Sequence, residues 1–450
     1  MLERNIFETS QSTCPKCLER IEARLIEQEG KIYFNKICPA HGEVNILISE
    51  HAQEYKALRA YYFKLMDRCL PQQTYMLYLT DKCNLSCPIC SANFKGCEGV
   101  LDLSWEEIKE IVDDNPGKNF FLCGAEPSTR KDLVEVIRLL KMRQGEVFLY
   151  SNGLNFTNLD YVKKLKAAGL DKVYLSFDGF NDEIYETLRG EKLLATKMKV
   201  LEILKAAGVS VMLCAVLLKE VNVDQIKRLF DYALANDFIC ELDLVPYLLA
   251  GESADYLPDS FFMPHEVIDL VEEQTAGFIT RQSIFLFQKF LYAYMAFLNR
   301  RICLAYNTFW LYREKGNQVI PIDRLLDLKS VESKLDTYAD FFTKNRILAR
   351  AYFLWILLIL GKNLVIKHFA LSLQLGKMLC LHVFRKNIKT RKSGSKFFKI
   401  LFSSCCDATK IDFRITDYCA AGMVWKNNKG KVCWVDGLWE YILERENKTG

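Results

Sequence analysis

Short apolar runs alternate with amphipathic stretches between residues 74 and 246. The apolar runs have the length of buried strands, and the amphipathic stretches have apolar residues at helical spacing. The predicted strands are Tyr75–Thr80, Asn119–Cys123, Val147–Tyr150, Val173–Phe177, Ser210–Leu217 and Glu241–Val245. The predicted helices are Trp105–Asp113, Lys131–Met142, Leu159–Ala168, Leu194–Ala206 and Val223–Ala235. Strands joined by helical crossovers predict an α/β fold with a parallel sheet.

The pattern changes on both sides of this region. Residues 280–299 are rich in aromatic side chains, which predicts a core helix or, as the alternative, the wall of an apolar substrate channel. The predicted division of the chain is a metal-binding ribbon at 1–50, a connecting helix at 51–71, the α/β core at 72–250, a helical region at 251–342, a basic apolar segment at 343–404 and a cysteine-containing tail at 405–450.

Composition excludes several classes of protein. The chain has 450 residues, of which 50% are hydrophobic and 26% charged, so it is neither disordered nor collagen-like. A net charge of +4 is no general signature of nucleic-acid binding. The longest clean apolar run, Ala351–Leu360, has ten residues, whereas a bilayer span needs about 20. We therefore expect no membrane-embedded helix.

The 17 cysteines are the outlier in this composition. Disulfide scaffolds are usually short secreted chains, and the stretch Met1–Lys16 lacks the apolar core of a signal peptide. The cysteines therefore predict metal or iron–sulfur ligation in the reducing cytoplasm.

Residues 343–404 combine apolar runs with thirteen Lys and Arg and contain no Asp or Glu. This combination is typical of a helix that lies on an anionic membrane surface. The alternative is a pair of core helices with a solvated lysine face. Nucleic-acid binding is disfavoured, because so apolar a segment suits a phosphate backbone poorly. The segment predicts peripheral contact with the inner membrane face.

A loop with three cysteines, Cys83, Cys87 and Cys90, follows the first predicted strand of the core. Three thiolates hold three irons of a [4Fe–4S] cube and leave the fourth iron open, whereas electron-transfer clusters use four cysteines. An open iron can chelate a substrate-like molecule. The loop resembles the signature of the radical S-adenosylmethionine (SAM) superfamily.

Later stretches agree with this resemblance. Residues 123–127 are similar to the Gly-Gly-Glu-Pro motif of the superfamily, with Ala125 in place of the second glycine. The resemblance implies a partial (βα)6 TIM-like barrel that generates a 5′-deoxyadenosyl radical from SAM. It implies that Glu126 receives the SAM amino group, that Ser176 and Asp178 bind the ribose, and that Ile89 lies near the adenine. The implied cofactor-binding residues are Cys83, Cys87, Ile89, Cys90, Gly124, Ala125, Glu126, Asn152, Ser176, Asp178 and Arg189. Arg189 approaches the SAM carboxylate or forms a structural ion pair, and no catalytic acid or base is predicted.

Two further cysteine sets lie outside the core. Cys14, Cys17, Cys38 and His41 form two knuckles with the spacing of a tetrahedral site, which predicts zinc or iron in an N-terminal ribbon. The second set predicts one auxiliary iron–sulfur cluster with the ligands Cys303, Cys406, Cys419 and Cys433, and with Cys405 as an alternative ligand. Buried free thiols are the other reading of this second set.

A metal ribbon directly before such a core resembles the tetraether lipid synthase group. That resemblance implies a substrate with lipid hydrocarbon chains and coupling of two chains through a new carbon–carbon bond. The main alternative is a peptide or small-metabolite substrate gripped with the help of the auxiliary cluster. RNA modification and a non-catalytic interaction protein are weaker alternatives. A reductive mechanism also predicts an electron donor such as ferredoxin or flavodoxin.

Overall fold

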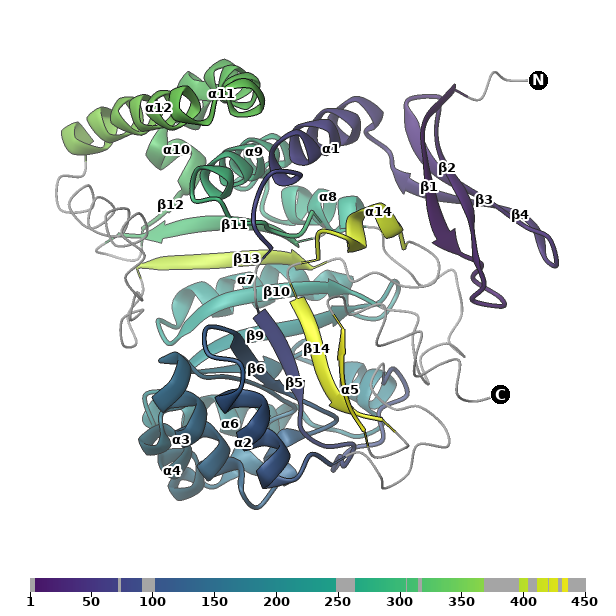
Figure 1. The fold of residues 1–450 in the computed structure, drawn as a ribbon. Coiled ribbons are helices and arrows are strands. Elements are labelled where there is room, and N and C mark those ends of the chain that lie inside the picture. Colours follow the sequence, from purple (N-terminus) through teal and green to yellow (C-terminus); the bar gives the residue numbers. More distant parts are fainter. Residues whose placement is uncertain are drawn as a thin grey trace.

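The computed structural model describes the chain in ten ranges: 5–71, 74–90, 102–247, 264–304, 306–314, 318–367, 396–403, 411–419, 421–427 and 431–435. Within them, two sheets and their covering helices form the fold (Figure 1). The smaller sheet belongs to the N-terminal ribbon, and the larger one contains the predicted α/β core.

The ribbon is a four-stranded antiparallel sheet in the order β1-β2-β3-β4. Its strands are β1 (Asn5–Thr13), β2 (Arg20–Gln28), β3 (Lys31–Cys38) and β4 (Gly42–Ser49). Leu25, Ile32 and Phe34 bury one face against the start of α1 (Ala52–Met66). Helix α1 lies within the predicted connecting segment 51–71, and it leads from the ribbon to the helical layer of the core (Figure 1).

The core contains the six predicted strands as parallel neighbours. They are β5 (Thr74–Tyr78), β6 (Asn119–Cys123), β7 (Phe148–Ser151), β8 (Lys172–Ser176), β9 (Ser210–Leu217) and β10 (Ile239–Pro246). The helices that cover them are α2 (Trp105–Asp113), α3 (Leu133–Gln144), α4 (Leu159–Ala168), α5 (Asp182–Arg189), α6 (Leu194–Ala206) and α7 (Ile226–Ala235). Repeated strand–helix crossovers produce this partial TIM-like barrel, so the predicted fold class is confirmed.

C-terminal strands extend the core sheet at both edges. β13 (Phe397–Ser403) pairs in parallel with β10, and β14 (Ala421–Lys426) pairs in parallel with β5. With β11 (Tyr306–Arg313), β12 (Val319–Pro321) and β15 (Val432–Val435), they complete an 11-stranded sheet in the order β12-β11-β13-β10-β9-β8-β7-β6-β5-β14-β15. The assignment of all of 343–404 to a membrane-facing segment is therefore wrong for 397–403, because these residues form an interior strand of the sheet.

The post-core helices pack in a layer above the extended sheet (Figure 1). They are α8 (Pro264–Gln274), α9 (Arg281–Phe297), α10 (Ile322–Leu326), α11 (Glu332–Lys344) and α12 (Arg346–Lys367), and the short α14 (Phe413–Thr416) lies beside the ribbon. The aromatic stretch 280–299 forms α9, whose side chains are mostly buried. This outcome confirms the core-helix reading of that stretch.

Candidate active site and metal centre

The motif loop after β6 is held against the end of β5 by backbone hydrogen bonds. The Ala125 N–H donates to the carbonyl of Thr80 (2.8 Å), and the Glu126 N–H donates to the carbonyl of Lys82 (3.0 Å). Gly124 has φ +148°, and a Cβ atom built on it would lie 2.8 Å from the Thr80 oxygen. Only glycine fits at 124, whereas the structure accommodates Ala125. The loop thus joins the cluster segment 83–90 to the second strand of the barrel.

Glu126 is buried and organises two loops. One carboxylate oxygen accepts hydrogen bonds from the Ser128 N–H (3.0 Å) and the Ser151 hydroxyl (2.8 Å). The other accepts from the Asn152 N–H (2.6 Å). These three hydrogen bonds tie the loop after β6 to the loop after β7.

Asn152 reaches the cluster loop directly. Its side-chain amide donates to the side-chain oxygen of Asn84 (2.7 Å) and lies 3.8 Å from the Cys83 sulfur. Cys83 is exposed as a residue, but desolvation of its thiol raises the pKa to about 11. Cys87 and Cys90 lie on the same loop and are partly exposed. The structure therefore places the loop with the three cysteines beside the motif loop and Asn152, although the three sulfurs do not form a compact ligand group.

Asp178 and Arg189 form a two-point ion pair. Both nitrogen–oxygen distances are 2.8 Å, and the Val216 N–H also donates to the Asp178 carboxylate (3.1 Å). Asp178 is fully buried, so its carboxylate is engaged by the protein and not open toward a ribose. Arg189 also interacts electrostatically with Cys87. Of the two readings for Arg189, the structure shows the ion pair.

Lys197 on α6 is a further residue of this end of the barrel that was not predicted from the sequence. This side chain is fully buried, and its ammonium donates to the carbonyls of Asn152 (2.6 Å) and Ser176 (2.8 Å) and to the Ser176 hydroxyl (2.9 Å). Burial lowers the pKa of Lys197 to about 8. The signal was available, because Lys197 shares its helix face with the buried Val200, Leu201 and Leu204. A lysine at a core position of an amphipathic helix points to a buried partner.

Ile89 lies in an apolar cluster beside the cysteine loop. It is 5% exposed and packs with Ile184, Leu188, Leu218 and Tyr247. This surface is apolar, as the implied contact with an adenine ring requires.

The barrel interior is layered along β10. Glu241 pairs with Lys172 (2.8 Å) and Lys399 (3.1 Å), and Asp243 follows one layer further along the strand. In register, Asp243 lies beside Cys214 of β9 and Leu401 of β13. Asp243 is 8% exposed, and burial raises the pKa of its carboxyl to about 6.

The ribbon brings its four predicted ligands together. The Cys17 and Cys38 sulfurs are 3.8 Å apart, and His41 Nδ1 lies 3.6 Å from the Cys14 sulfur and 3.5 Å from the Cys38 sulfur. Around Zn²⁺ with normal bond lengths, a tetrahedron has sulfur–sulfur edges of about 3.8 Å and sulfur–nitrogen edges of about 3.6 Å. Burial tends to raise the pKa of Cys14, but backbone N–H donors and neighbouring thiols lower it to about 7. The donor set therefore fits a zinc ion.

The proposed auxiliary ligands are not brought together among the described residues. Cys303, Cys419 and Cys433 belong to no compact group of metal-ligating side chains, and within the described ranges the ribbon forms the one such group. Cys405 and Cys406 lie outside the described residues. The auxiliary cluster therefore stays a prediction.

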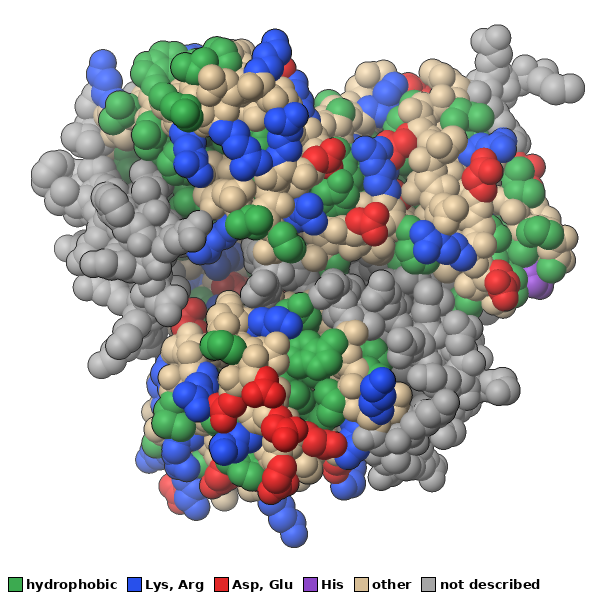
Figure 2. All heavy atoms as spheres, viewed as in Figure 1, with side chains coloured by type: hydrophobic (Ala, Val, Ile, Leu, Met, Phe, Trp, Pro, Cys, Tyr) green, Lys and Arg blue, Asp and Glu red, His purple; other side chains and the backbone are tan. Residues whose placement is uncertain are grey.

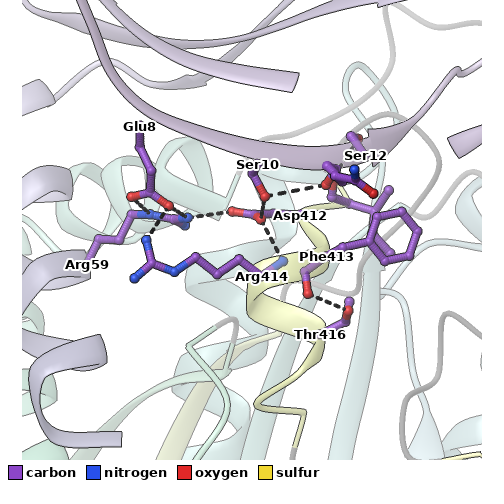
Figure 3. Close-up of polar contacts among 10 residues, drawn as sticks. Glu8, Ser10, Ser12, Arg59, Asp412, Phe413, Arg414 and Thr416 are labelled. Atoms are coloured by element: carbon purple, nitrogen blue, oxygen red, sulfur yellow. Dashed lines mark hydrogen bonds and ion pairs between the residues drawn. The ribbon is translucent and has the colours of Figure 1, made fainter. Parts of the chain in front are cut away.

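A buried charge network joins the ribbon to α1 and α14 (Figure 3). Arg59 of α1 is 2% exposed and pairs with Glu8 of β1 and with Asp412 (2.7 Å). Arg414 also donates to Glu8 (2.8 Å), and the Ser10 hydroxyl donates to Asp412 (2.5 Å). The ribbon is thus fixed to the segment that leads into β14.

Comparison with known proteins assigns both parts of this architecture. Residues 77–233 match the radical SAM superfamily, and residues 6–50 match the HMPTM N-terminal zinc ribbon domain. The two regions coincide with the barrel and the four-stranded sheet. The cysteine loop lies in the first matched region, and the compact Cys/His group of the ribbon lies in the second.

The chain is similar to curated proteins over part of their length. A 7,8-dihydro-6-hydroxymethylpterin dimethyltransferase of Methanocaldococcus jannaschii is 35% identical over 304 residues, which are 61% of this chain and 60% of that protein. A probable GTP 3′,8-cyclase of Pyrococcus horikoshii is 32% identical over 199 residues, 43% of this chain and 62% of that protein. This chain spans about three fifths of the length of both.

Solved structures give a weaker match. A crystal structure of SuiB of Streptococcus suis bound to its precursor peptide SuiA has a TM-score of 0.39 and 18% identity, and the match covers half of each chain. Together, the two matched regions identify residues 77–233 as a radical SAM domain and residues 6–50 as an N-terminal zinc ribbon domain.

Proposed function

We propose that this enzyme works at a membrane surface and modifies the hydrocarbon chains of lipids. When bound, the iron–sulfur cluster and SAM supply the 5′-deoxyadenosyl radical that abstracts hydrogen from an unactivated carbon. The observation that carries the lipid proposal is the surface of α12.

Helix α12 has two apolar faces. Ala349, Phe353, Ile356 and Leu360 are buried at helical spacing against the core. A second set of large apolar side chains faces solvent, and its exposed fractions are Ile347 81%, Leu348 54%, Leu354 46%, Trp355 45% and Leu358 72%. A contiguous exposed apolar surface of this kind is typical of a docking site.

Cations border this apolar surface. Lys344, Arg346, Arg350 and Lys362 are exposed on or directly before α12, and hydrophobic and basic side chains gather over α11 and α12 (Figure 2). Apolar burial combined with attraction to anionic headgroups is how interfacial helices bind membranes. No described helix has the length and hydropathy to cross a bilayer, so the proposed contact is peripheral.

The inside of the barrel also favours a largely apolar substrate. Tyr174, Met212 and Leu401 form a buried cluster against which Phe148 and Tyr150 pack. Within this interior, Asp243 adds a polar contact beside an otherwise apolar surface. The protein's own groups thus provide apolar walls, while Glu126, Asn152 and Lys197 hold the loops that surround the cofactors.

A small heterocyclic metabolite is the second candidate substrate. It is favoured by the 35% identity to a protein named as a pterin dimethyltransferase. In this alternative, Asp243 provides the polar contact and α12 contacts another protein. A peptide substrate is the third candidate, and a short precursor gene beside this one would favour it. We also propose a low-potential donor such as ferredoxin or flavodoxin as the electron source.

A vesicle experiment tests the membrane contact. We expect the reconstituted protein to bind vesicles that contain anionic phosphatidylglycerol, and binding to weaken with salt. The double variant Trp355→Ser, Leu358→Ser should lose most of this binding. Met142→Ser is the matched control, because Met142 is 72% exposed on the remote helix α3. Equal binding by all three proteins, or none at low salt, would refute the membrane proposal.

Lipid analysis tests the substrate. Cells that express the protein without oxygen should contain chain-modified lipids absent from cells with the triple variant Cys83→Ala, Cys87→Ala, Cys90→Ala. Mass spectrometry of hydrolysed chains would show coupling as two chains minus two hydrogens. Unchanged lipids in cells whose enzyme cleaves SAM would instead favour the heterocycle, and a new methylated pterin should then appear in the aqueous extract of the same cells.

A further inference from the structure

A cavity of about 190 Å³ lies where the ribbon meets the helical layer. Its walls come from β2, β3 and β4 of the ribbon, from α1, α8 and α9, and from α14. Most of the lining side chains are apolar, among them Leu25, Phe34, Ile48, Ile268, Ile284 and Phe285. The loops after β5 to β8 contribute no lining residue, so the cavity is separate from the SAM site.

Among the buried polar side chains of the cavity wall, two have nitrogen atoms without a hydrogen-bond partner in the described residues. His265 is 7% exposed, and its contact with the Ile48 backbone falls outside normal hydrogen-bond geometry, so neither ring nitrogen has a partner among the described residues. Arg59 is 2% exposed and interacts with Tyr55, but its Nη1 has no hydrogen bond of normal geometry within the same residues. Buried polar groups are nearly always hydrogen-bonded, and an unpaired one is costly. An oxygen atom placed in the cavity beside these nitrogens would offer them an acceptor.

The charges around the cavity are already balanced. Arg59 pairs with Glu8 and Asp412. Arg281 pairs with Asp269, and its second guanidinium nitrogen lies 3.9 Å from Glu54. Burial lowers the pKa of His265 to about 4, so its imidazole is neutral near pH 7. An ionised ligand would therefore bring an uncompensated charge into a largely apolar space.

We propose that the cavity between the ribbon and α9 binds a small neutral amphiphile, an alcohol, ether or ester whose oxygen accepts from Arg59 or His265. Its volume is comparable to that of an engineered apolar cavity of about 150 Å³ that binds benzene. One aromatic ring or a short aliphatic chain therefore fits. Because the occupant would touch β3, α1 and α9 together, it would fix the position of the ribbon on the core.

Calorimetry with three probes of one shape tests this proposal. Benzyl alcohol should bind the full-length reconstituted protein saturably at one site. Toluene, which lacks the oxygen, should bind about 3- to 10-fold more weakly, the value of one hydrogen bond. Benzoate should bind at least tenfold more weakly than the alcohol, because it is charged. Equal affinity for benzoate, or unsaturable partitioning of all three probes, would overturn the proposal.

Two variants locate the binding. Ile284→Trp fills the cavity and should abolish binding of benzyl alcohol, with iron content and SAM affinity unchanged. If the imidazole donates to the ligand oxygen, His265→Leu should bind benzyl alcohol and toluene with equal affinity. If His265→Leu still prefers benzyl alcohol over toluene, Arg59 is the donor. If the tryptophan variant does not fold, photolabelling of the unmodified protein with a diazirine derivative of benzyl alcohol decides. The proposal is supported if peptides containing Phe285 or Ile48 are labelled and benzyl alcohol prevents this labelling. It is overturned if only other peptides are labelled.

Discussion

The ammonium group of Lys197 lies 2.9 Å from the hydroxyl oxygen of Ser176 and 2.6 Å from the carbonyl oxygen of Asn152. These two residues end neighbouring barrel strands, and both are implied to surround SAM. One buried side chain from α6 therefore ties together the carboxyl ends of β7 and β8. The ammonium has three N–H donors, and three oxygen atoms accept from it. Its hydrogen-bonding capacity is therefore filled.

Replacing Lys197 should loosen this end of the barrel. We expect Lys197→Met to weaken SAM binding about tenfold, because the strand ends that carry Asn152 and Ser176 lose their common donor. Calorimetry of the reconstituted protein measures the affinity, and the electron paramagnetic resonance spectrum of the reduced cluster with SAM reports whether the cofactor geometry changed. Lys199→Met on the exposed face of the same helix is the control. Unchanged affinity and spectrum in Lys197→Met would show that the lysine supports folding only.

Periodicity predicted the barrel strands well because alternation and helical spacing are local properties. The helices Leu159–Ala168 and Leu194–Ala206 were predicted with the bounds that the structure shows. Metal spacing also predicted the ribbon ligands, since two knuckles on one sheet are close in sequence. In contrast, β13 and β14 join the barrel from more than 150 residues away in sequence, and no local pattern predicts such pairing. The partners of Asp178 and Lys197 are much closer in sequence, at separations of 11 to 45 residues, but they lie on different elements, and periodicity does not predict which buried polar side chains meet.

The two turns at Gly124 and Gly145 allow a clean test of the motif loop. Both glycines have positive φ, +148° and +85°, but only a Cβ at 124 would meet the Thr80 backbone, at 2.8 Å. Gly145→Ala adds conformational strain alone, which costs roughly 1 kcal/mol. Gly124→Ala should cause the same kind of strain and should also displace the loop that carries Glu126. We therefore expect it to reduce SAM cleavage at least tenfold. Measuring SAM cleavage and thermal stability separates the effects, and equal activity of the two variants would contradict this view of the loop.

Asp243 should make stability depend on pH. Burial raises the pKa of its carboxyl from 3.8 to about 6, so the folded state holds the proton more tightly than the unfolded chain. This contribution to stability is present below about pH 4 and is lost as the pH rises through 6. The unfolding free energy of Asp243→Asn, relative to that of the unmodified protein, should therefore rise by about 1–1.5 kcal/mol between pH 5 and pH 8. Denaturant unfolding at both pH values measures the difference, with exposed Asp231→Asn as the control. A constant difference would show that Asp243 is not protonated in the folded protein.

Removal of the metal from the ribbon should destabilise the C-terminal segment 411–416. The ribbon strand β1 holds Asp412 and Arg414 through Ser10 and Glu8 (Figure 3), and β14 follows directly after this contact. Cys38→Ser should lose the one zinc ion per chain, because a site with three strong ligands binds zinc much more weakly. Hydrogen exchange should then rise both in β1 and in residues 411–416, since the buried charges of Arg59 and Asp412 lose their fixed partners. Cys240→Ala, a thiol remote from the ribbon, should leave both segments protected. Faster exchange in β1 alone would show that the ribbon and the C-terminal segment are not coupled through this network.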